Sequence, residues 1–339
     1  MKQWRLTGYF AWIMVCCMSE KSFKNPFVFV VGCPRSGTTL LQRMLDAHPE
    51  MTIANDTHFI TRAAKRALRK NPNPELTAEL LKQVESYRRF YRMGLESRDV
   101  HEASQHCSTY SEFVSSLYNR RAELKGKTIS GEKTPDYCRQ MPVLSGLFPR
   151  AKFIHIIRDG RDTTLSTLDW ATETKGPGRW SLWATDPVGT CALWWKWQAG
   201  SGHFEGQRLG KALYHELKYE DLVADPTGEL KQISEFLQIL FSEKMARFYE
   251  GKTRTQEGLS AKSAWIPPTS GLRNWKAQMS DEDVAVFDGI AGDFLDKISY
   301  ERRIYKGSQA VKRRIDRCLA WWTDEEKHNR GSYKSSKLT

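Results

Sequence analysis

The sequence has few of the features that mark disulfide-rich, zinc-binding or membrane-spanning chains. Its 339 residues include seven cysteines, an odd number, and none of them forms a CxxC pair. This usage argues against a disulfide framework and a zinc site, and it favours a reducing compartment. The apolar stretch Leu6–Met18 covers 13 residues, fewer than the roughly 20 that a helix needs to cross a bilayer. We therefore expect a cytoplasmic location.

The first 24 residues allow two interpretations. In the favoured one, translation starts at Met18 and a short polar lead precedes the first strand. In the alternative, residues 1–24 are an extension whose apolar part acts as a weak membrane anchor. A signal peptide is disfavoured because the segment CCMSE after the apolar stretch contains no obvious small-residue cleavage site.

Positive charge is in excess. Lys and Arg number 52 against 40 Asp and Glu, which gives a net charge of +12, and the pI is about 9.3. This balance favours a polyanionic partner, such as nucleic acid, acidic lipid, an acidic polymer or a multiply phosphorylated cofactor. A solvated basic surface accounts for it equally well. Because no RNA-binding or helix-turn-helix signature is present, we do not expect a nucleic-acid partner.

The stretch FVFVVGCPRSGTTLL predicts a buried strand that turns into a helix. Phe27–Val31 is an unbroken run of β-favouring apolar residues, as in a strand covered on both faces. Gly32 and Gly37 bracket the following loop, which offers backbone N–H groups and a helix N-terminus to an anion. The alternative is an ordinary glycine turn between a strand and a helix.

The same loop lacks one residue of an ATPase loop. The Walker pattern GxxxxGK[ST] places a lysine directly after the second glycine. Thr38 stands at that position, and Arg35 supplies a positive charge from inside the loop instead. The loop is therefore suited to an anion but argues against ordinary ATP hydrolysis.

A second basic segment, IIRDGRDTTLS, follows another predicted strand. Arg158 lies at the strand end, Arg161 three residues later, and Ser166 further along the next helix. Two guanidinium groups and a hydroxyl at the carboxyl end of a strand suit a second phosphate. The alternative is a charged helix start in which an aspartate caps the helix and the arginines are solvated.

Strands alternate with helices along the chain, and the clearest strands end near Gly32, Arg158 and Tyr219. This order predicts a single α/β domain, with a P-loop-like parallel sheet flanked by helices on both faces. Ligands of such sheets bind beyond the carboxyl ends of the strands. We place the domain at residues 25–305 and a basic helical extension at residues 306–339.

Other segments are predicted from their pattern. Helices are expected over residues 61–70, 74–93 and 190–202, and a mobile loop over residues 171–188, in a region that holds six tryptophans. The tail predicts a basic amphipathic helix whose apolar stripe consists of Val311, Ile315, Leu319 and Trp322. Such a stripe packs on its own domain or lies on an anionic membrane as a peripheral contact.

The two basic segments together resemble the sulfotransferases that use 3′-phosphoadenosine 5′-phosphosulfate (PAPS). The segments LDAHPEMTIANDTHF, GEKTPDY, YEDLVADP and GLRNWK are similar to further parts of this family, which includes bacterial, tyrosylprotein and heparan-type enzymes. The matches run in family order from about Phe27 to Lys276. The resemblance implies PAPS as co-substrate, a hydroxyl-bearing acceptor and no metal.

The resemblance also implies roles in cofactor binding. The loop that holds the 5′-phosphosulfate corresponds to Pro34, Arg35, Ser36, Gly37, Thr38 and Thr39. By the same resemblance, Arg158 and Ser166 would bind the 3′-phosphate. Tyr219 would stack on adenine, with a plain core tyrosine as the alternative, and Arg273 and Lys276 would contact the cofactor from a late loop.

Asp56 and Lys133 take catalytic roles by resemblance, together with Arg35, and the chemistry of histidine adds one further candidate. Asp56 stands where the family has a glutamate as base, and it is one methylene shorter. His58 is a second candidate, since histidine has an unperturbed pKa of about 6.5, and the sequence leaves the choice open. Lys133, the lysine of GEKTPDY, would stabilise the negative charge that grows on the leaving phosphate.

We therefore predict in-line transfer of a sulfuryl group to a hydroxyl of a carbohydrate, a lipid, a small molecule or a tyrosine. One alternative is a nucleotide kinase or NTPase with a degenerate loop. The other is a non-enzymatic binder of nucleic acid or acidic lipid. The sequence does not choose the acceptor or the oligomeric state.

Overall fold

The structure is a computed structural model that describes residues 27–251, 267–269, 271–303 and 308–329. The N-terminal lead at residues 1–24, the alternative start at Met18 and the end of the tail lie outside the described residues, as does part of the late loop before Lys276. Within the described ranges, every helix is too short or too polar to span a bilayer.

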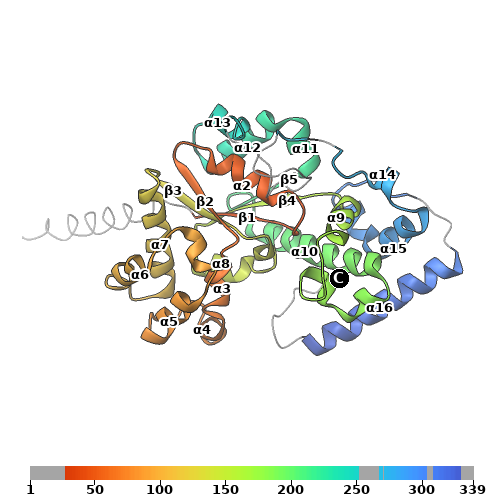
Figure 1. Ribbon diagram of the computed structural model, residues 1–339, viewed down its shortest axis with the longest axis horizontal. Helices are drawn as coiled ribbons and strands as arrows, with labels where there is room; N and C mark the ends of the chain where they lie inside the picture. Colours follow the sequence, from red (N-terminus) through yellow and green to blue (C-terminus); the bar gives the residue numbers. More distant parts are fainter. Residues whose placement is uncertain (1–26, 252–266, 270, 304–307, 330–339) are drawn as a thin grey trace, which may run out of the picture.

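The centre of the molecule is a sheet of five parallel strands (Figure 1). The strands are β1 (Val28–Val31), β2 (Met51–Asn55), β3 (Ile129–Lys133), β4 (Lys152–Ile157) and β5 (Tyr214–Lys218). Their order across the sheet is β2-β3-β1-β4-β5. In this register Val30 lies beside Lys133, and Val31 lies beside His155. The predicted parallel α/β sheet is confirmed.

Strand β1 lies in the middle because every one of its side chains is apolar and buried. Successive side chains point to opposite faces of a strand, so Phe29 and Val31 pack with α7 (Tyr110–Leu124) and α8 (Met141–Leu147). Val28 and Val30 pack with α2 (Thr38–Asp46) and α12 (Pro226–Leu237) on the other face. Figure 1 shows these two helical layers above and below the sheet, as predicted.

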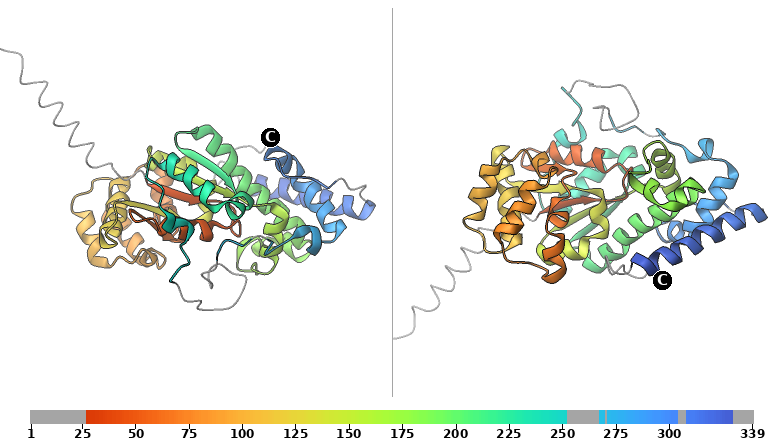
Figure 2. Two further views of the ribbon diagram at one scale, coloured as in Figure 1. Left: turned by 90° about the horizontal axis from the view of Figure 1, so that it is seen from above. Right: turned by 60° about the horizontal axis from the view of Figure 1, so that its bottom comes forward.

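A third apolar cluster lies beside the sheet, between α10 (Pro187–Leu209), α15 (Asp281–Lys297) and α16 (Gln309–Asn329). Figure 1 and the right view of Figure 2 show α16, in blue, along the outer side of α15 and α10. The short α9 (Gly160–Leu168) connects this cluster to the end of β4. The C-terminal extension is therefore packed against the domain.

The helical region between β2 and β3 is more broken than the sequence pattern predicted. It contains α3 (Phe59–Arg62), α4 (Lys65–Lys70), α5 (Ala78–Ser86), the 3₁₀ helix η1 (Phe90–Met93) and α6 (Ser97–Ser104). The predicted helix over residues 74–93 begins only after Thr77, whose hydroxyl accepts from the Leu80 amide. Helix α6 was missed, and it starts with a capping box between Glu96 and Asp99.

The predicted loop over residues 171–188 contains two 3₁₀ turns, η3 (Gly176–Arg179) and η4 (Ser181–Ala184). Helix α10 then begins earlier and ends later than the predicted range 190–202. Asp186 starts it, because the carboxylate accepts from the Gly189 amide at 2.9 Å and Pro187 occupies the first turn. The remaining short elements are η2 (Pro135–Arg139), α11 (Tyr219–Ala224), α13 (Glu243–Ala246) and α14 (Trp275–Gln278).

The apolar stripe of the tail differs from the predicted one by one residue. Val311 and Cys318 are buried, and Ile315 and Trp322 pack beside them. Leu319 is 39% exposed, so its assignment to the stripe was wrong. At 100° per residue, position 318 points closer to the common direction of positions 311, 315 and 322 than position 319 does.

Two arginines of the tail point inward. Arg314 Nε and Arg317 Nη2 donate to the buried Asp186 Oδ2 at 2.9 and 3.2 Å. Asp186 thus caps α10 and anchors α16 at the same time. Burial alone would raise the pKa of the Asp186 carboxyl, but Arg314 and the Gly189 amide outweigh burial and lower it.

We predict that Asp186→Ala lowers the free energy of unfolding by about 2–3 kcal/mol at pH 7, because it removes a helix cap and leaves two arginines without their carboxylate. Urea unfolding measures this loss. Since the carboxyl pKa is lowered in the fold, its contribution is complete above the unfolded pKa of about 4 and disappears as the pH falls below it. The difference between the two proteins should therefore shrink in acid.

Asp316→Ala is the matched control. Asp316 pairs with Lys312 on the exposed side of the same helix, and both side chains are more than half exposed. This substitution should change stability by less than about 0.5 kcal/mol. Equal losses from the two substitutions would contradict the anchoring role of Asp186.

Candidate active site

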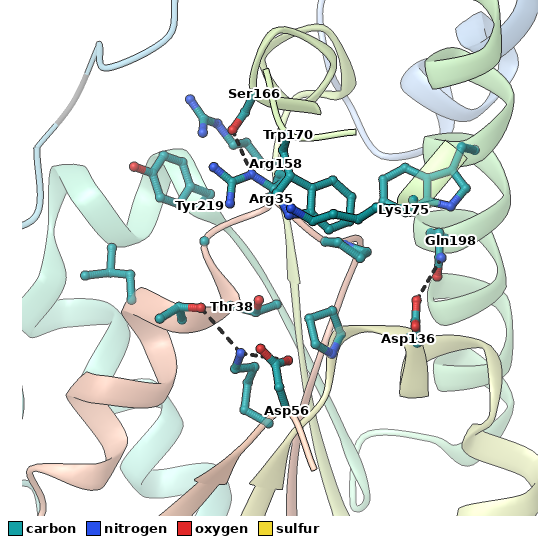
Figure 3. A pocket seen from close by; sticks show the side chains of 18 of the residues that line it. Arg35, Thr38, Asp56, Asp136, Arg158, Ser166, Trp170, Lys175, Gln198 and Tyr219 are labelled. Carbon is teal, nitrogen blue, oxygen red and sulfur yellow. Dashed lines mark hydrogen bonds and ion pairs between the residues drawn. The ribbon is translucent and has the colours of Figure 1, made fainter. Parts of the chain in front are cut away.

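A pocket of about 1060 Å³ opens at the carboxyl ends of the parallel strands. The loops that follow β1, β2, β3 and β4 all contribute to its lining, as does the start of α11 after β5. The predicted convergence of the three polar motifs is therefore found in the structure. Figure 3 shows Arg35, Arg158 and Ser166 together on one side, Asp56 below them, and Asp136 with Gln198 on another side.

The loop between β1 and α2 has the geometry of an anion-binding loop. Arg35 has φ 79° and Gly37 has φ 91°, so the backbone turns through the left-handed region. A Cβ on Gly37 would lie 2.4 Å from the Tyr219 ring, so only glycine fits there. Helix α2 begins at Thr38 without a side-chain cap, which leaves its first amides to a ligand.

The structure brings most of the predicted loop residues to the pocket. Pro34, Arg35, Gly37, Thr38 and Thr39 line it. Ser36 differs, since its side chain is buried and its Oγ has no hydrogen-bond partner among the described residues. The Ser36 amide donates to the Cys33 carbonyl at 3.1 Å, so the structure does not bring Ser36 to the pocket.

Three guanidinium groups crowd the same side of the pocket. Arg35 Nε donates to Ser166 Oγ at 3.0 Å, and Arg158 lies 4.5 Å from the centre of the Tyr219 ring. Burial lowers the pKa of Arg35, and the positive charges of Arg273 and Arg158 lower it further. Like charges held this close repel one another, so an anion bound between them would be stabilised.

Two predicted cations are engaged elsewhere. Arg161 is fully buried, donates to Asp159 and Asp288, and lies 3.7 Å from the Trp275 ring. It fixes α9 to α15 and is not in the pocket lining, so the sequence-based assignment of both arginines to a phosphate was wrong for Arg161. Lys276 Nζ donates to Glu301 at 2.8 Å on the surface. The structure does not bring Lys276 to the pocket.

Arg273, by contrast, lines the pocket and forms an ion pair with Asp169. Tyr219 also lines it. Its ring lies against Gly37 on one side and beneath the Arg158 guanidinium on another. A cation over an aromatic face is a stabilising contact, so Tyr219 helps to fix Arg158 in place.

The two main catalytic candidates are ion-paired. Lys133 Nζ lies 3.1 Å from Asp56 Oδ1 and 3.4 Å from Thr39 Oγ1. Lys133 ends β3, Asp56 directly follows β2, and Thr39 is on α2. The Lys133 side chain is 1% exposed. The Lys133 ammonium group therefore contacts both the Asp56 carboxylate and the first turn of α2.

The loop that carries Asp56 is strained. Asp56 and His58 both have φ near +57°, a conformation that costs residues other than glycine about 1–3 kcal/mol. Backbone bonds offset this cost, since the Asp56 amide donates to the Lys133 carbonyl at 2.7 Å and the Thr57 amide donates to Glu132 Oε1 at 2.9 Å. Strain of this kind is concentrated at functional sites.

Glu132 is the buried support of this loop. Its carboxylate also accepts from the Tyr118 hydroxyl at 2.8 Å and from the Thr134 hydroxyl. Burial raises the pKa of Glu132, and these donors oppose the rise. Glu132 therefore positions the Asp56 loop while taking no place in the pocket lining.

His58 is held as a neutral imidazole. Burial lowers its pKa to about 4, and the positive charge of Arg62 adds to the effect. Its Nδ1 lies 4.0 Å from Asp136 Oδ2. Asp136 itself accepts from Arg62 Nη2 and from Gln198 Nε2, each at 3.1 Å. This network could not be predicted from the sequence, apart from the position of Asp136 shortly after Lys133.

The other half of the pocket is cationic and aromatic. Its lining contains the basic residues Arg62, Arg89, Arg92, Arg139, Lys175 and Arg179 and the aromatic residues Trp170, Trp180, Trp194 and Trp197. Sequence reasoning missed the arginines, because they come from several separate elements. Among the described residues, no group of three His, Cys, Asp or Glu side chains forms a candidate metal site.

Comparisons with known proteins agree with this geometry. A family model described as "Sulfotransferase family" matches residues 26–243. The chain is 26% identical over 291 residues to protein-tyrosine sulfotransferase A of Caenorhabditis elegans, with 82% of this chain and 68% of that protein covered. It is 31% identical over 143 residues to human protein-tyrosine sulfotransferase 1, covering 42% of this chain and 34% of that protein. The matched regions thus cover from 34% to 68% of these relatives.

Solved structures show the same fold. The sulfotransferase domain from the curacin biosynthetic pathway aligns with a TM-score of 0.57 at 18% identity, over 82% of this chain and 99% of that one. The sulfotransferase domain from the Synechococcus PCC 7002 olefin synthase aligns with a TM-score of 0.54 at 21% identity, over 89% of this chain and all of that one. Because the family model matches residues 26–243, which include the five strands and most of the pocket, the chain belongs to the sulfotransferase family, whose enzymes transfer sulfuryl groups.

Proposed function

We propose that the chain transfers a sulfuryl group from PAPS to the hydroxyl of an acceptor, by in-line displacement and without a metal. The observation that carries the proposal is that Lys133 Nζ lies within hydrogen-bond distance of both Asp56 and Thr39, which is in the first turn of α2. Family membership supports the sulfuryl transfer, and the crowded guanidinium groups support a donor with more than one phosphate.

The donor would lie along the ends of β1 and β4. The loop Pro34–Thr39 offers amides and the Arg35 guanidinium to the 5′-phosphosulfate. Arg158, Ser166 and Arg273 would hold the 3′-phosphate. Tyr219 fixes Arg158, and its contact with adenine stays a prediction. Lys276 is left out of this site, because its ammonium group is bound to Glu301.

Asp56 and Lys133 have complementary tasks in the transfer. The acceptor oxygen bonds to sulfur as the bond from sulfur to the phosphate oxygen breaks. Asp56 accepts the proton of the acceptor hydroxyl, and Lys133 donates to the oxygen that leaves with the electron pair. A cation held at the point where negative charge grows stabilises the transition state more than the ground state.

A tyrosyl hydroxyl of a protein is our first candidate acceptor. The relatives named above are protein-tyrosine sulfotransferases. We call the part of the pocket that is lined by basic and tryptophan residues the acceptor half. Its basic residues Arg62, Arg89, Arg92 and Arg139 favour carboxylates beside the reacting hydroxyl. The network at Asp136 keeps some of these arginines in place.

We expect Lys133→Ala and Asp56→Asn each to lower kcat by about 100- to 1000-fold, the usual effect of removing one group that stabilises or deprotonates in the transition state. The assay measures transfer of labelled sulfate from PAPS to an acidic tyrosyl peptide. Lys196→Ala is the control, because Lys196 on α10 forms an ion pair with Asp293 on α15 and does not line the pocket. Full activity in both pocket variants would show that this pair is not catalytic.

Arg158→Ala should weaken the binding of adenosine 3′,5′-bisphosphate by about 10- to 100-fold, because a charged hydrogen bond to phosphate contributes about 1.5–3 kcal/mol. Its effect on adenosine 5′-monophosphate, which lacks the 3′-phosphate, should be much smaller. Calorimetric titration measures both ligands. Arg208→Ala is the control, since this side chain is 76% exposed. An equal loss for the two nucleotides would contradict the placement of Arg158 at the 3′-phosphate.

The pH dependence separates the two candidate bases. Because the pKa of His58 is lowered to about 4, its imidazole stays neutral between pH 5.5 and 7.5 and kcat/KM should not change there through His58. His58→Asn should keep the shape of the profile, whereas Asp56→Asn should abolish most activity across it. An acid limb near pH 6.5 that vanishes in His58→Asn would make His58 the base.

A further inference from the structure

Trp180 and Trp197 form an aromatic wall in the part of the pocket where we place the acceptor, and the C-terminal helix α16 supports this wall. Trp180 and Trp197 line the pocket, and both contact α16. The centroid of the Trp180 ring lies 5.3 Å from that of Trp321 and 5.8 Å from that of Trp322. Trp197 lies 5.9 Å from Trp322 and 5.8 Å from Trp180. These are the spacings of packed aromatic pairs.

The contact between α16 and this wall is fixed by polar bonds. Trp321 Nε1 donates to the Oγ of Ser181, the residue after Trp180, at 2.9 Å. About two turns and one turn earlier on α16, Arg314 and Arg317 bind Asp186, which caps the helix that carries Trp197. Helix α16 therefore holds both the η4 turn and the start of α10.

The wall also connects to the polar groups of the pocket. The Arg139 guanidinium lies 4.0 Å from the centre of the Trp197 ring. Its Nε donates to Gln198 Oε1 at 2.9 Å, and Gln198 donates to Asp136 at 3.1 Å. A shift of Trp197 would therefore move Arg139 as well as the apolar surface. The loop Pro34–Thr39 belongs to other elements, since it lies between the end of β1 and the start of α2.

We propose that Trp180 and Trp197 determine acceptor specificity by packing against a planar ring of the acceptor, and that Trp322 is a positioning residue that holds them. This inference rests on the proposed sulfotransferase function and adds to it the residues that would select a phenolic ring over an aliphatic alcohol. Half-buried tryptophans in a pocket gain free energy when a flat apolar ring covers them. Helix α16 lies outside residues 26–243, the range matched by the family model.

Removal of the Trp322 ring should loosen the wall without touching the donor site. Truncation of a packed aromatic side chain leaves a cavity, and the neighbouring rings relax into it. Trp180 and Trp197 would then lose the orientation that the acceptor requires. We expect Arg35, in the loop after β1, to keep its contact with Ser166 on α9, and Lys133 on β3 to keep its contact with Asp56.

The test measures binding in two steps, so that it does not depend on turnover. Calorimetry first measures adenosine 3′,5′-bisphosphate binding to the full chain. The saturated protein is then titrated with an acidic tyrosyl peptide and with the same peptide carrying serine. We expect the wild type to prefer the tyrosyl peptide by at least tenfold, and Trp322→Ala to weaken the tyrosyl peptide by about tenfold while nucleotide binding changes less than twofold.

Two variants serve as controls. Leu319→Ala removes a side chain that is 39% exposed on the same helix, and it should leave both affinities unchanged. Trp322→Phe keeps a ring at the contact and should restore most of the peptide affinity. Where the variants turn over PAPS, the KM for the peptide should rise in Trp322→Ala and the KM for PAPS should not.

The outcomes separate this inference from the proposed function. Absence of nucleotide binding in the wild type would overturn the proposed function itself. Nucleotide binding with no preference for the tyrosyl peptide, or with the same peptide affinity in Trp322→Ala, would overturn the role of the wall alone. An equal loss of nucleotide and peptide binding in Trp322→Ala would show a purely structural role. If that variant fails to fold, Trp180→Ala applies the same test from the pocket side.

Discussion

The site depends on a buried carboxylate that holds a strained loop. Glu132 accepts from the Thr57 amide, the Tyr118 hydroxyl and the Thr134 hydroxyl, and it thereby fixes the turn in which Asp56 and His58 adopt left-handed conformations. Without these bonds the turn would relax, because left-handed conformations are unfavourable for both residues. Asp56 would then lose its place beside Lys133. Glu132, which lies outside the pocket lining, thus fixes the position of the Asp56 carboxylate, the proposed base.

The parallel sheet explains why residues far apart in sequence share one site. Arg35 follows β1, Asp56 follows β2, Lys133 ends β3 and Arg158 follows β4. Neighbouring parallel strands end at the same edge, so each contributes one group to the same pocket. The order β2-β3-β1-β4-β5 places the transfer pair on one side of β1 and the arginine cluster on the other. In the proposed reaction, the donor phosphates and the acceptor hydroxyl would therefore have separate supports.

Local patterns in the sequence were sufficient for the parts of the fold with strong signals. The apolar runs of β1 and β4 predicted the sheet, and the glycines around Arg35 predicted the turn from β1 into α2. The role of Lys133, by contrast, was inferred only from the family resemblance. Features that depend on long-range packing could not be predicted in this way. The burial of Arg161 between Asp159 and Asp288 and the network around Asp136 arise only when distant helices pack together. The tail was assigned the right character, but the buried Cys318 replaces Leu319 in its stripe because the partner surface on α10 and α15 decides the register.

The position of α16 has a consequence for the order in which the molecule is completed. The residues that we assign to the donor are all present once the chain reaches Arg273, whereas the support of Trp180 and Trp197 begins only at Gln309. During synthesis the sheet and the anion loop can therefore assemble before the acceptor wall exists. A nascent or truncated chain that ends before α16 would have a donor site beside an unsupported acceptor half. Cleavage before Gln309 would consequently separate the two binding capacities of one pocket.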